Sequence, residues 1–211
     1  MKLFYAPGAG SLSPHIVLRE AGRRFDLERV DLTTQRTASG ADFRQINPKG
    51  YVPALKLDGP DSPILTEGPV IIQYIADLAP ETHLLPPHGT LARYHLQDWL
   101  NFLASKLHPQ FDELVEAGTP ARVAAHHRGK IGERLLYVQD VLNDRAFLMG
   151  ETFTVADAYL YVMLRWCNPL GIDLGLYPNL DDYEHRIAER PAVQRALASE
   201  GLDHHRYRRG A

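Results

Sequence analysis

The chain has 211 residues, of which 45% are hydrophobic and 23% are charged, which is typical of a soluble globular protein. A formal net charge of −3 gives no reason to expect nucleic acid as a partner. No apolar run approaches the roughly 20 residues of a membrane-spanning helix, so no membrane partner is expected. The single cysteine, Cys167, excludes an intramolecular disulfide, and residues 1–5 already have a strand pattern that leaves no room for a signal peptide. These features predict a cytoplasmic protein.

The N-terminal part alternates strand and helix patterns. Residues 2–5 form a short apolar strand, and a loop of small residues follows. Ser13 and Pro14 then mark a helix start, with Ser13 as the predicted cap. Residues 25–32 alternate apolar and polar side chains with the period of two that a strand requires. Strand, helix and strand within about 30 residues predict a parallel βαβ unit.

The stretch from Asn47 to Ala79 combines a hairpin with a helix start. Val52 and Pro53 precede an apolar strand at residues 54–57, and a turn rich in glycine and proline follows it. A second strand is predicted at residues 64–66. A hairpin on its own is an ordinary structural element and indicates no function. Its functional interpretation depends on the residues that follow it.

Glu67, Gly68 and Pro69 open a helix whose apolar residues recur at helical spacing. The backbone N–H groups of Glu67 and Gly68 are expected at or just before the positive end of this helix, where a ligand carboxylate can be held. With a weakly periodic segment near Phe43 counted as a short helix, the predicted order of the first 80 residues is βαβαββα.

The rest of the chain is predicted to be helical after residues 81–90, whose prolines and lack of periodicity indicate a linker. Thr154 and Asp157 form a capping signature in which Asp157 returns to the helix start. The helix that follows is nearly all apolar and should be the most buried. The predicted helices are residues 91–107, 123–142, 155–166, 183–188 and 191–198.

These motifs together resemble glutathione transferases, and the bacterial beta class above all. The resemblance rests on MKLFYAPGAGSLSPHIVLREAG, NPKGYVPAL, TEGPVIIQYIAD, DWLNFLASKLH and FTVADAYL, so it covers nearly the whole chain. It implies an α/β thioredoxin-like domain at residues 1–80, a linker at 81–90 and an all-α domain at 91–203. It also implies a homodimeric detoxification enzyme that conjugates the thiolate of glutathione to small hydrophobic electrophiles. Glutathione is then a co-substrate, and no permanently bound cofactor is expected.

The resemblance also implies a glutathione site. Val52 offers its backbone N–H and C=O to the cysteinyl part of glutathione, with the Val52–Pro53 bond cis. Glu67 and Gly68 hold the γ-glutamyl end, and three residues of the first helix of the all-α domain reach the ligand. The implied binding residues are Gly10, Gln35, Val52, Pro53, Glu67, Gly68, Asn101, Ser105 and His108.

Two of these positions depart from the class. Gly10 stands where the class has a cysteine in the first loop, and Gln35 stands where a lysine is common. Without the cysteine, the first loop cannot form a mixed disulfide with glutathione. Cys167 cannot replace it, because it lies far along the chain on a helix of the other domain. We therefore expect conjugation rather than thiol–disulfide exchange.

Catalysis requires ionisation of the glutathione thiol, because the thiolate is the nucleophile. A hydroxyl donor and a helix N-terminus both favour the charged form. Ser11 has both available and is the predicted stabiliser, although a serine here can also be a helix cap or a loop residue. Tyr5 and His108 are the other catalytic candidates. Tyr5 is equally compatible with the core, and His108, at the predicted helix end, with a helix-dipole partner.

Other chemistry is weakly supported. The adjacent histidines at 126–127 and 204–205 lack the spacing of a metal-binding helix face, so no metal site is expected. The basic residues 204–209 predict a solvated tail. On the same fold, a glutathione-dependent isomerase or dehalogenase is an alternative function. A non-catalytic glutathione- or ligand-binding protein, which lost turnover with its cysteine, is another.

Overall fold

The computed structural model describes residues 1–116 and 118–202. The chain divides into two compact units. Unit 1 contains Met1–Leu85 and the described residues from Arg190 onward, and unit 2 contains Pro86–Glu189. The predicted domain end at residue 203 and the basic tail at 204–209, with its histidine pair, lie outside the described residues.

Unit 1 is built on a five-stranded mixed sheet with the strand order β3-β2-β1-β4-β5. Strand β1 pairs in parallel with β2, as the predicted βαβ unit requires, and antiparallel with β4. Strands β4 and β5 pair antiparallel, as the predicted hairpin requires. The predicted thioredoxin-like order βαβαββα is confirmed, with the two-residue strand β3 as an addition. The elements are β1 (Lys2–Tyr5), α1 (Leu12–Glu20), β2 (Asp26–Asp31), β3 (Arg36–Thr37), the 3-10 turn Phe43–Gln45, β4 (Ala54–Lys56), β5 (Ile64–Thr66), α2 (Gly68–Asp77), the 3-10 turn Pro80–Thr82 and α8 (Pro191–Glu200).

The strand register brings three loops to one edge of this sheet. Phe4, next to the end of β1, pairs with Ala54, which begins β4. Ala54 pairs in turn with Thr66, which ends β5. Antiparallel neighbours run in opposite directions, so the end of β1, the beginning of β4 and the end of β5 lie at the same side of the sheet. The loop after β1, the segment before β4 and the start of α2 therefore meet there.

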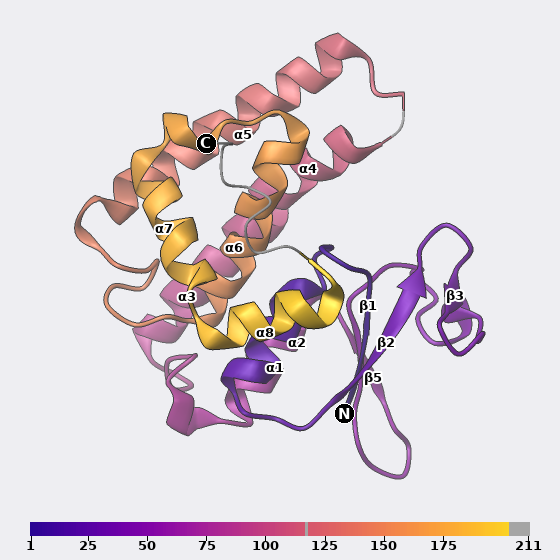
Figure 1. The fold of residues 1–211 in the computed structure, drawn as a ribbon. Helices are drawn as coiled ribbons and strands as arrows, with labels where there is room; N and C mark the ends of the chain where they lie inside the picture. The colour runs from indigo at the N-terminus through magenta and orange to yellow at the C-terminus, as the bar shows by residue number, and fades with distance from the viewer. Residues whose placement is uncertain (117, 203–211) are drawn as a thin grey trace. The chain divides into compact units, whose positions relative to one another are not determined.

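Helix α1 packs against α2 and α8 (Figure 1). It begins at Leu12, so the prediction that Ser13 caps it is wrong. Ser11 already has helical backbone angles, which moves the helix start forward and leaves Ser13 in the first turn. There the Ser13 hydroxyl donates a hydrogen bond to the Gly10 carbonyl at 3.0 Å.

Helix α8 groups with unit 1, whereas the all-α domain predicted at residues 91–203 includes it. Helix α8 packs on α1, and polar contacts also join the two helices. The Arg190 guanidinium donates two hydrogen bonds to the Glu20 carboxylate, at 2.6 and 3.0 Å. At the other end of α8, the Glu200 carboxylate contacts His15 on α1. The last described helix therefore returns to the first helix of the chain.

Unit 2 is helical, as predicted. A π-helical turn at Leu103–Leu107 joins α3 directly to α4, so His108 begins a helix instead of ending one. The interpretation of His108 as a C-terminal dipole partner is therefore wrong; the adjacent Pro109 fits the first turn of α4. The helices are α3 (Leu91–Phe102), α4 (His108–Val115), α5 (Ala121–Val141), α6 (Val155–Cys167) and α7 (Pro178–Ala188).

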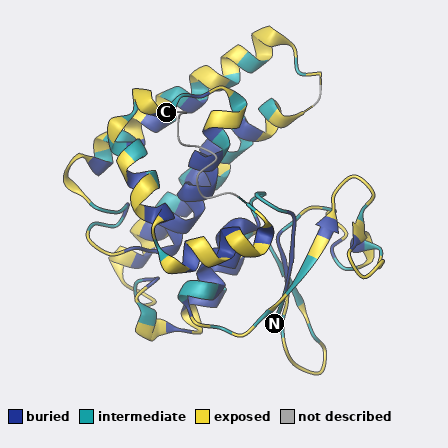
Figure 2. Cartoon of the chain, viewed as in Figure 1, coloured by how far each residue is buried: buried dark blue, intermediate teal, exposed yellow. Residues whose placement is uncertain are grey.

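Helix α6 forms the centre of unit 2. All of its residues except Trp166 are buried, as predicted for the most apolar helix (Figure 2). The predicted cap is confirmed, because the Asp157 carboxylate accepts a hydrogen bond from the Thr154 backbone N–H at 2.7 Å. None of the described helices is both long enough and apolar enough to cross a lipid bilayer.

Candidate functional site

The segment before β4 carries a backbone donor and acceptor that the described part of the chain does not use. The Val52–Pro53 peptide bond is cis, as predicted. The Val52 side chain packs against the core cluster around Phe43 and Ala54. Among the described residues, none makes a hydrogen bond with the Val52 backbone N–H or C=O. These two groups can pair with an extended peptide in the manner of a neighbouring strand.

The start of α2 lies beside this segment. A side-chain carbon added at Gly68 would lie 3.8 Å from Cγ of Pro53. The backbone N–H groups of Glu67 and Gly68 have no acceptor within the described residues. Glu67 has a φ of +68°, which is uncommon for a residue other than glycine, at the junction of β5 and α2. The two N–H groups therefore form a positive end that suits a carboxylate.

The Glu67 side chain is bound by two residues that the sequence did not single out. The Lys49 ammonium and the Tyr51 hydroxyl both donate to its Oε1, the hydroxyl at 2.9 Å. The Lys49 ammonium also donates to the Thr66 hydroxyl at 3.0 Å. The hydrogen bond from Lys49 lowers the pKa of Glu67, against a smaller opposing effect of burial. The carboxylate is therefore ionised at neutral pH.

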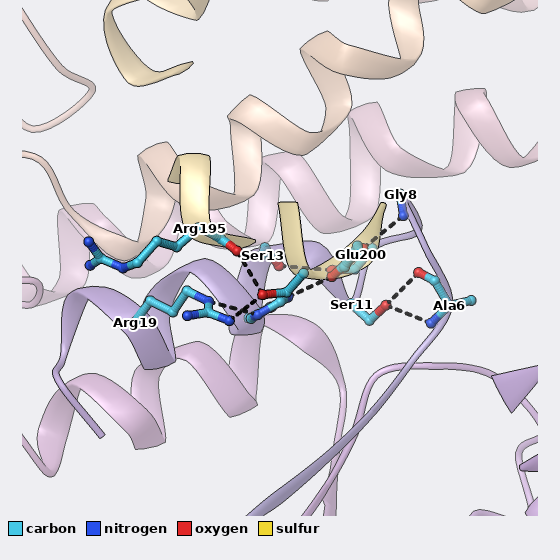
Figure 3. A network of polar contacts seen from close by, with 10 residues as sticks. Ala6, Gly8, Ser11, Ser13, Arg19, Arg195 and Glu200 are labelled. Carbon is cyan, nitrogen blue, oxygen red and sulfur yellow. Dashed lines mark hydrogen bonds and ion pairs between the residues drawn. The ribbon is translucent and has the colours of Figure 1, made fainter. Parts of the chain in front are cut away.

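The loop before α1 is braced by Ser11. Its hydroxyl accepts a hydrogen bond from the Ala6 N–H at 3.1 Å and donates one to the Ala6 carbonyl at 3.2 Å (Figure 3). The side chain is fully buried. The backbone N–H groups of Gly10 and Ser11, in contrast, have no acceptor within the part of the chain that is described. The start of α1 therefore offers backbone donors, rather than a free hydroxyl, to an anion.

Tyr5 ends β1 and is buried. Burial, followed by the negative charge of Glu200, raises the pKa of the Tyr5 phenol, and the charge of Arg29 opposes this. The hydroxyl therefore stays protonated at neutral pH and can act only as a neutral hydrogen-bonding group.

Gln35 braces the loop at residues 47–51. Its side-chain amide donates to the carbonyls of Leu32 and Gly50, at 2.8 and 3.0 Å. Its Oε1 is buried and has no hydrogen-bond partner among the described residues. Both amide protons are thus occupied by the protein, which is a different arrangement from that expected of a lysine that meets a ligand carboxylate.

In unit 2, Asn101, Ser105 and His108 follow one another along the continuous run of α3, the π turn and α4. Asn101 and Ser105 are exposed, and His108 is half-buried. A π turn inside a helix is frequent at functional sites, because it shifts the side chains that follow it. The structure thus brings these three predicted residues into one neighbourhood of unit 2.

His108 lies in a partly aromatic setting. Its Nδ1 is 2.6 Å from the Tyr159 hydroxyl, and its ring centre is 4.9 Å from that of Trp166. Its Nε2 is 3.6 Å from the carboxylate of Asp112. Burial lowers the pKa of His108, and the Asp112 charge opposes that shift. The imidazole is therefore neutral at pH 7 and can accept a proton.

Replacing Asp112 with asparagine is expected to lower the pKa of His108 further, because the charge that favours the imidazolium is removed. A titration of the His108 ring by heteronuclear NMR measures this shift. The substitution Asp98→Asn, at an exposed position of α3, is the control and should leave the titration unchanged. A higher pKa in Asp112→Asn would contradict the assignment.

Other candidate groups do not add a site. Within residues 1–116 and 118–202, no group of three or more His, Cys, Asp or Glu side chains is arranged to hold a metal ion. Cys167 is buried on α6, and burial raises the pKa of its thiol well above the ordinary value. A thiol in this setting is protonated and inert.

Two family models match the chain: the glutathione S-transferase N-terminal domain at residues 11–78 and the glutathione S-transferase C-terminal domain at residues 102–191. Glutathione S-transferase GstA of Escherichia coli O157:H7 is 45% identical over 96% of this chain and 100% of that protein. The bacterial beta-class enzyme of Sphingomonas chungbukensis has a TM-score of 0.93 and 46% identity over 96% of this chain and 100% of its own. A sphingomonad glutathione S-transferase complexed with glutathione has a TM-score of 0.92 and 45% identity, with the same coverage. The chain belongs to the glutathione S-transferase family.

Proposed function

We propose that this protein conjugates the thiolate of glutathione to small hydrophobic electrophiles. The observation that carries the proposal is the pair of Val52 backbone groups that no described residue uses, next to the N–H groups of Glu67 and Gly68, which also lack an acceptor among those residues. Glutathione has the matching groups, because its cysteinyl residue has a peptide N–H and C=O and its γ-glutamyl residue has a carboxylate. In this proposal Val52 pairs with the cysteinyl residue, and Glu67 and Gly68 hold the γ-glutamyl end, with Pro53 and Gln35 lining the site.

The sulfur then lies at the start of α1, where Gly10 and Ser11 stabilise the thiolate. Because the Ser11 hydroxyl is bonded to Ala6, its backbone N–H is the donor that we propose for this role. One hydrogen bond to a charged group contributes about 1.5–3 kcal/mol, or roughly one to two pKa units. That suffices to ionise much of a thiol with a reference pKa of about 8.5 near neutral pH. Tyr5 would assist as a further donor.

We also propose that residues 1–80 form the glutathione-binding domain, residues 81–90 the linker and residues 91–203 the domain that receives the electrophile. Asn101, Ser105 and His108 would complete the site, with His108 as the proton carrier. A cytoplasmic detoxification enzyme fits this chemistry, since glutathione is kept reduced in that compartment.

The test combines retention on immobilised glutathione with conjugation of an activated aryl halide. We expect both, and an ultraviolet titration of bound glutathione should give a thiol pKa about one to two units below the free value. Tyr5→Phe and His108→Ala should raise this pKa, whereas Ser11→Ala keeps the backbone donor and should change it less. Retention without turnover would support a binding protein, an isomerase or a dehalogenase instead. Failure to bind glutathione would overturn the proposal.

We further propose that the protein is a homodimer, as the resemblance implies. Large apolar side chains are exposed at Val70 on α2, at Leu78 directly after α2, and at Leu91 and Tyr94 on α3. Large apolar side chains that remain exposed can mark a protein interface. Sedimentation at micromolar concentration should give about twice the chain mass of 23.7 kDa. A single species at the chain mass would contradict this proposal.

A further inference from the structure

Within residues 1–116 and 118–202, the Glu67 carboxylate is held at one of its two oxygens. Its Oε1 accepts hydrogen bonds from the Lys49 ammonium and the Tyr51 hydroxyl. Its Oε2 has no partner among the described residues. The side chain is 48% exposed, so solvent and ligands can reach it. A carboxylate oxygen has two lone pairs, so Oε2 is open to a cationic donor.

The two groups that hold Oε1 come from a braced loop. The buried Asn47 donates from its amide to the Tyr51 carbonyl at 2.7 Å and accepts from the Lys49 N–H at 3.2 Å. Gln35 donates to the Gly50 carbonyl between them. The backbone that carries Lys49 and Tyr51 is therefore fixed before any ligand binds, which is how a binding group is preorganised.

We propose that Lys49 and Tyr51 position the Glu67 carboxylate so that its Oε2 accepts a hydrogen bond from the α-ammonium group of the γ-glutamyl residue. This inference rests on glutathione being the ligand, as proposed above. The ammonium is the only cationic group of glutathione, and a charge-assisted bond to a carboxylate is its strongest available contact. Lys49 and Tyr51 act through Glu67 and are positioning residues. They make the site selective for ligands that carry a free amine.

The test is calorimetric titration with two ligands: glutathione, and its analogue glutaryl-cysteinyl-glycine, which lacks the α-amino group. Tyr51→Phe removes one donor to Glu67 and is expected to weaken the binding of glutathione about fivefold. The affinity for the analogue should not change. Lys49→Gln should have a similar selective effect. Lys49→Arg keeps a cationic donor and should restore most of the affinity. Glu67→Gln should erase the preference for glutathione, and adding Tyr51→Phe to it should change nothing further.

Matched surface changes serve as controls. Tyr137→Phe keeps its aromatic stacking, and Lys130→Gln breaks an exposed ion pair with Glu133; neither should alter binding. If Tyr51→Phe lost the same affinity for both ligands, the role of Tyr51 would be merely structural and the inference would be overturned. Tighter glutathione binding in Lys49→Gln would also overturn it, because Lys49 would then only compete with the ammonium. If wild type binds neither ligand, the proposed function itself fails.

Discussion

Replacing Asp157 with alanine is expected to lower the free energy of unfolding by about 4 kcal/mol. Its fully buried carboxylate accepts four hydrogen bonds. The Thr154 backbone N–H and hydroxyl each donate at 2.7 Å, the Leu148 N–H at 2.8 Å and the Tyr183 hydroxyl at 2.7 Å. Alanine removes the shared acceptor of these donors, and each buried donor left unsatisfied costs about 1–3 kcal/mol. The donors belong to three segments of unit 2, so the substitution removes stabilising hydrogen bonds from all three.

Denaturant unfolding followed by circular dichroism measures this loss. Alanine is the best helix former, so the substitution cannot destabilise α6 through helix propensity. Asp140→Ala, at an exposed position of α5, is the matched control and should change stability by less than about 0.5 kcal/mol. A comparably small change in Asp157→Ala would show that the carboxylate does not join these segments.

This cap could be predicted from the sequence because its signal is local. Thr154 and Asp157 are three residues apart, and the apolar run after them has helical spacing. The hairpin at residues 54–66 and the start of α2 were predictable for the same reason, because turn residues and apolar runs adjoin there. Local patterns alone did not predict the role of the Val52–Pro53 segment. That role was indicated by the resemblance to glutathione transferases.

Features that depend on distant partners could not be predicted. The sequence placed the Ser11 hydroxyl at the ligand, but its position in three dimensions lets it bond to both polar groups of Ala6. Lys49 and Tyr51 lie within a recognised motif, yet only the fold brings them to Glu67, which is 18 and 16 residues away, respectively. The π turn at Leu103–Leu107 was missed because apolar spacing over so short a segment does not distinguish one wide turn from an ordinary one.

The return of α8 to unit 1 includes a contact between residues 185 positions apart, which no local pattern encodes. The Glu200 Oε1 lies 2.7 Å from His15 Nδ1, and both side chains are fully buried. His15 Nε2 accepts a hydrogen bond from Arg19 Nε, which can only donate. The imidazole proton is therefore on Nδ1, and the contact is a charge-assisted hydrogen bond from a neutral histidine to a carboxylate.

Replacing Glu200 with alanine is expected to destabilise the protein by about 3 kcal/mol, because it removes the acceptor of a buried imidazole N–H. It also removes the acceptor of the Gly8 N–H, at 2.9 Å, so the loop that leads to Ser11 should loosen and the KM for glutathione should rise. Unfolding curves and steady-state kinetics measure the two effects, with exposed Glu151→Ala as the control.

Glu200→Gln separates the contribution of the hydrogen bonds from that of the space the side chain fills. A glutamine amide has the same shape but only one oxygen, so it can accept from His15 or from Gly8 but not from both. The stability of the Glu200→Gln variant and its KM for glutathione should therefore lie between those of wild type and Glu200→Ala. If Glu200→Gln were as stable as wild type while Glu200→Ala was not, packing rather than hydrogen bonding would hold α8 on α1. If neither variant changed the KM, the contact with Gly8 would not govern the loop before α1.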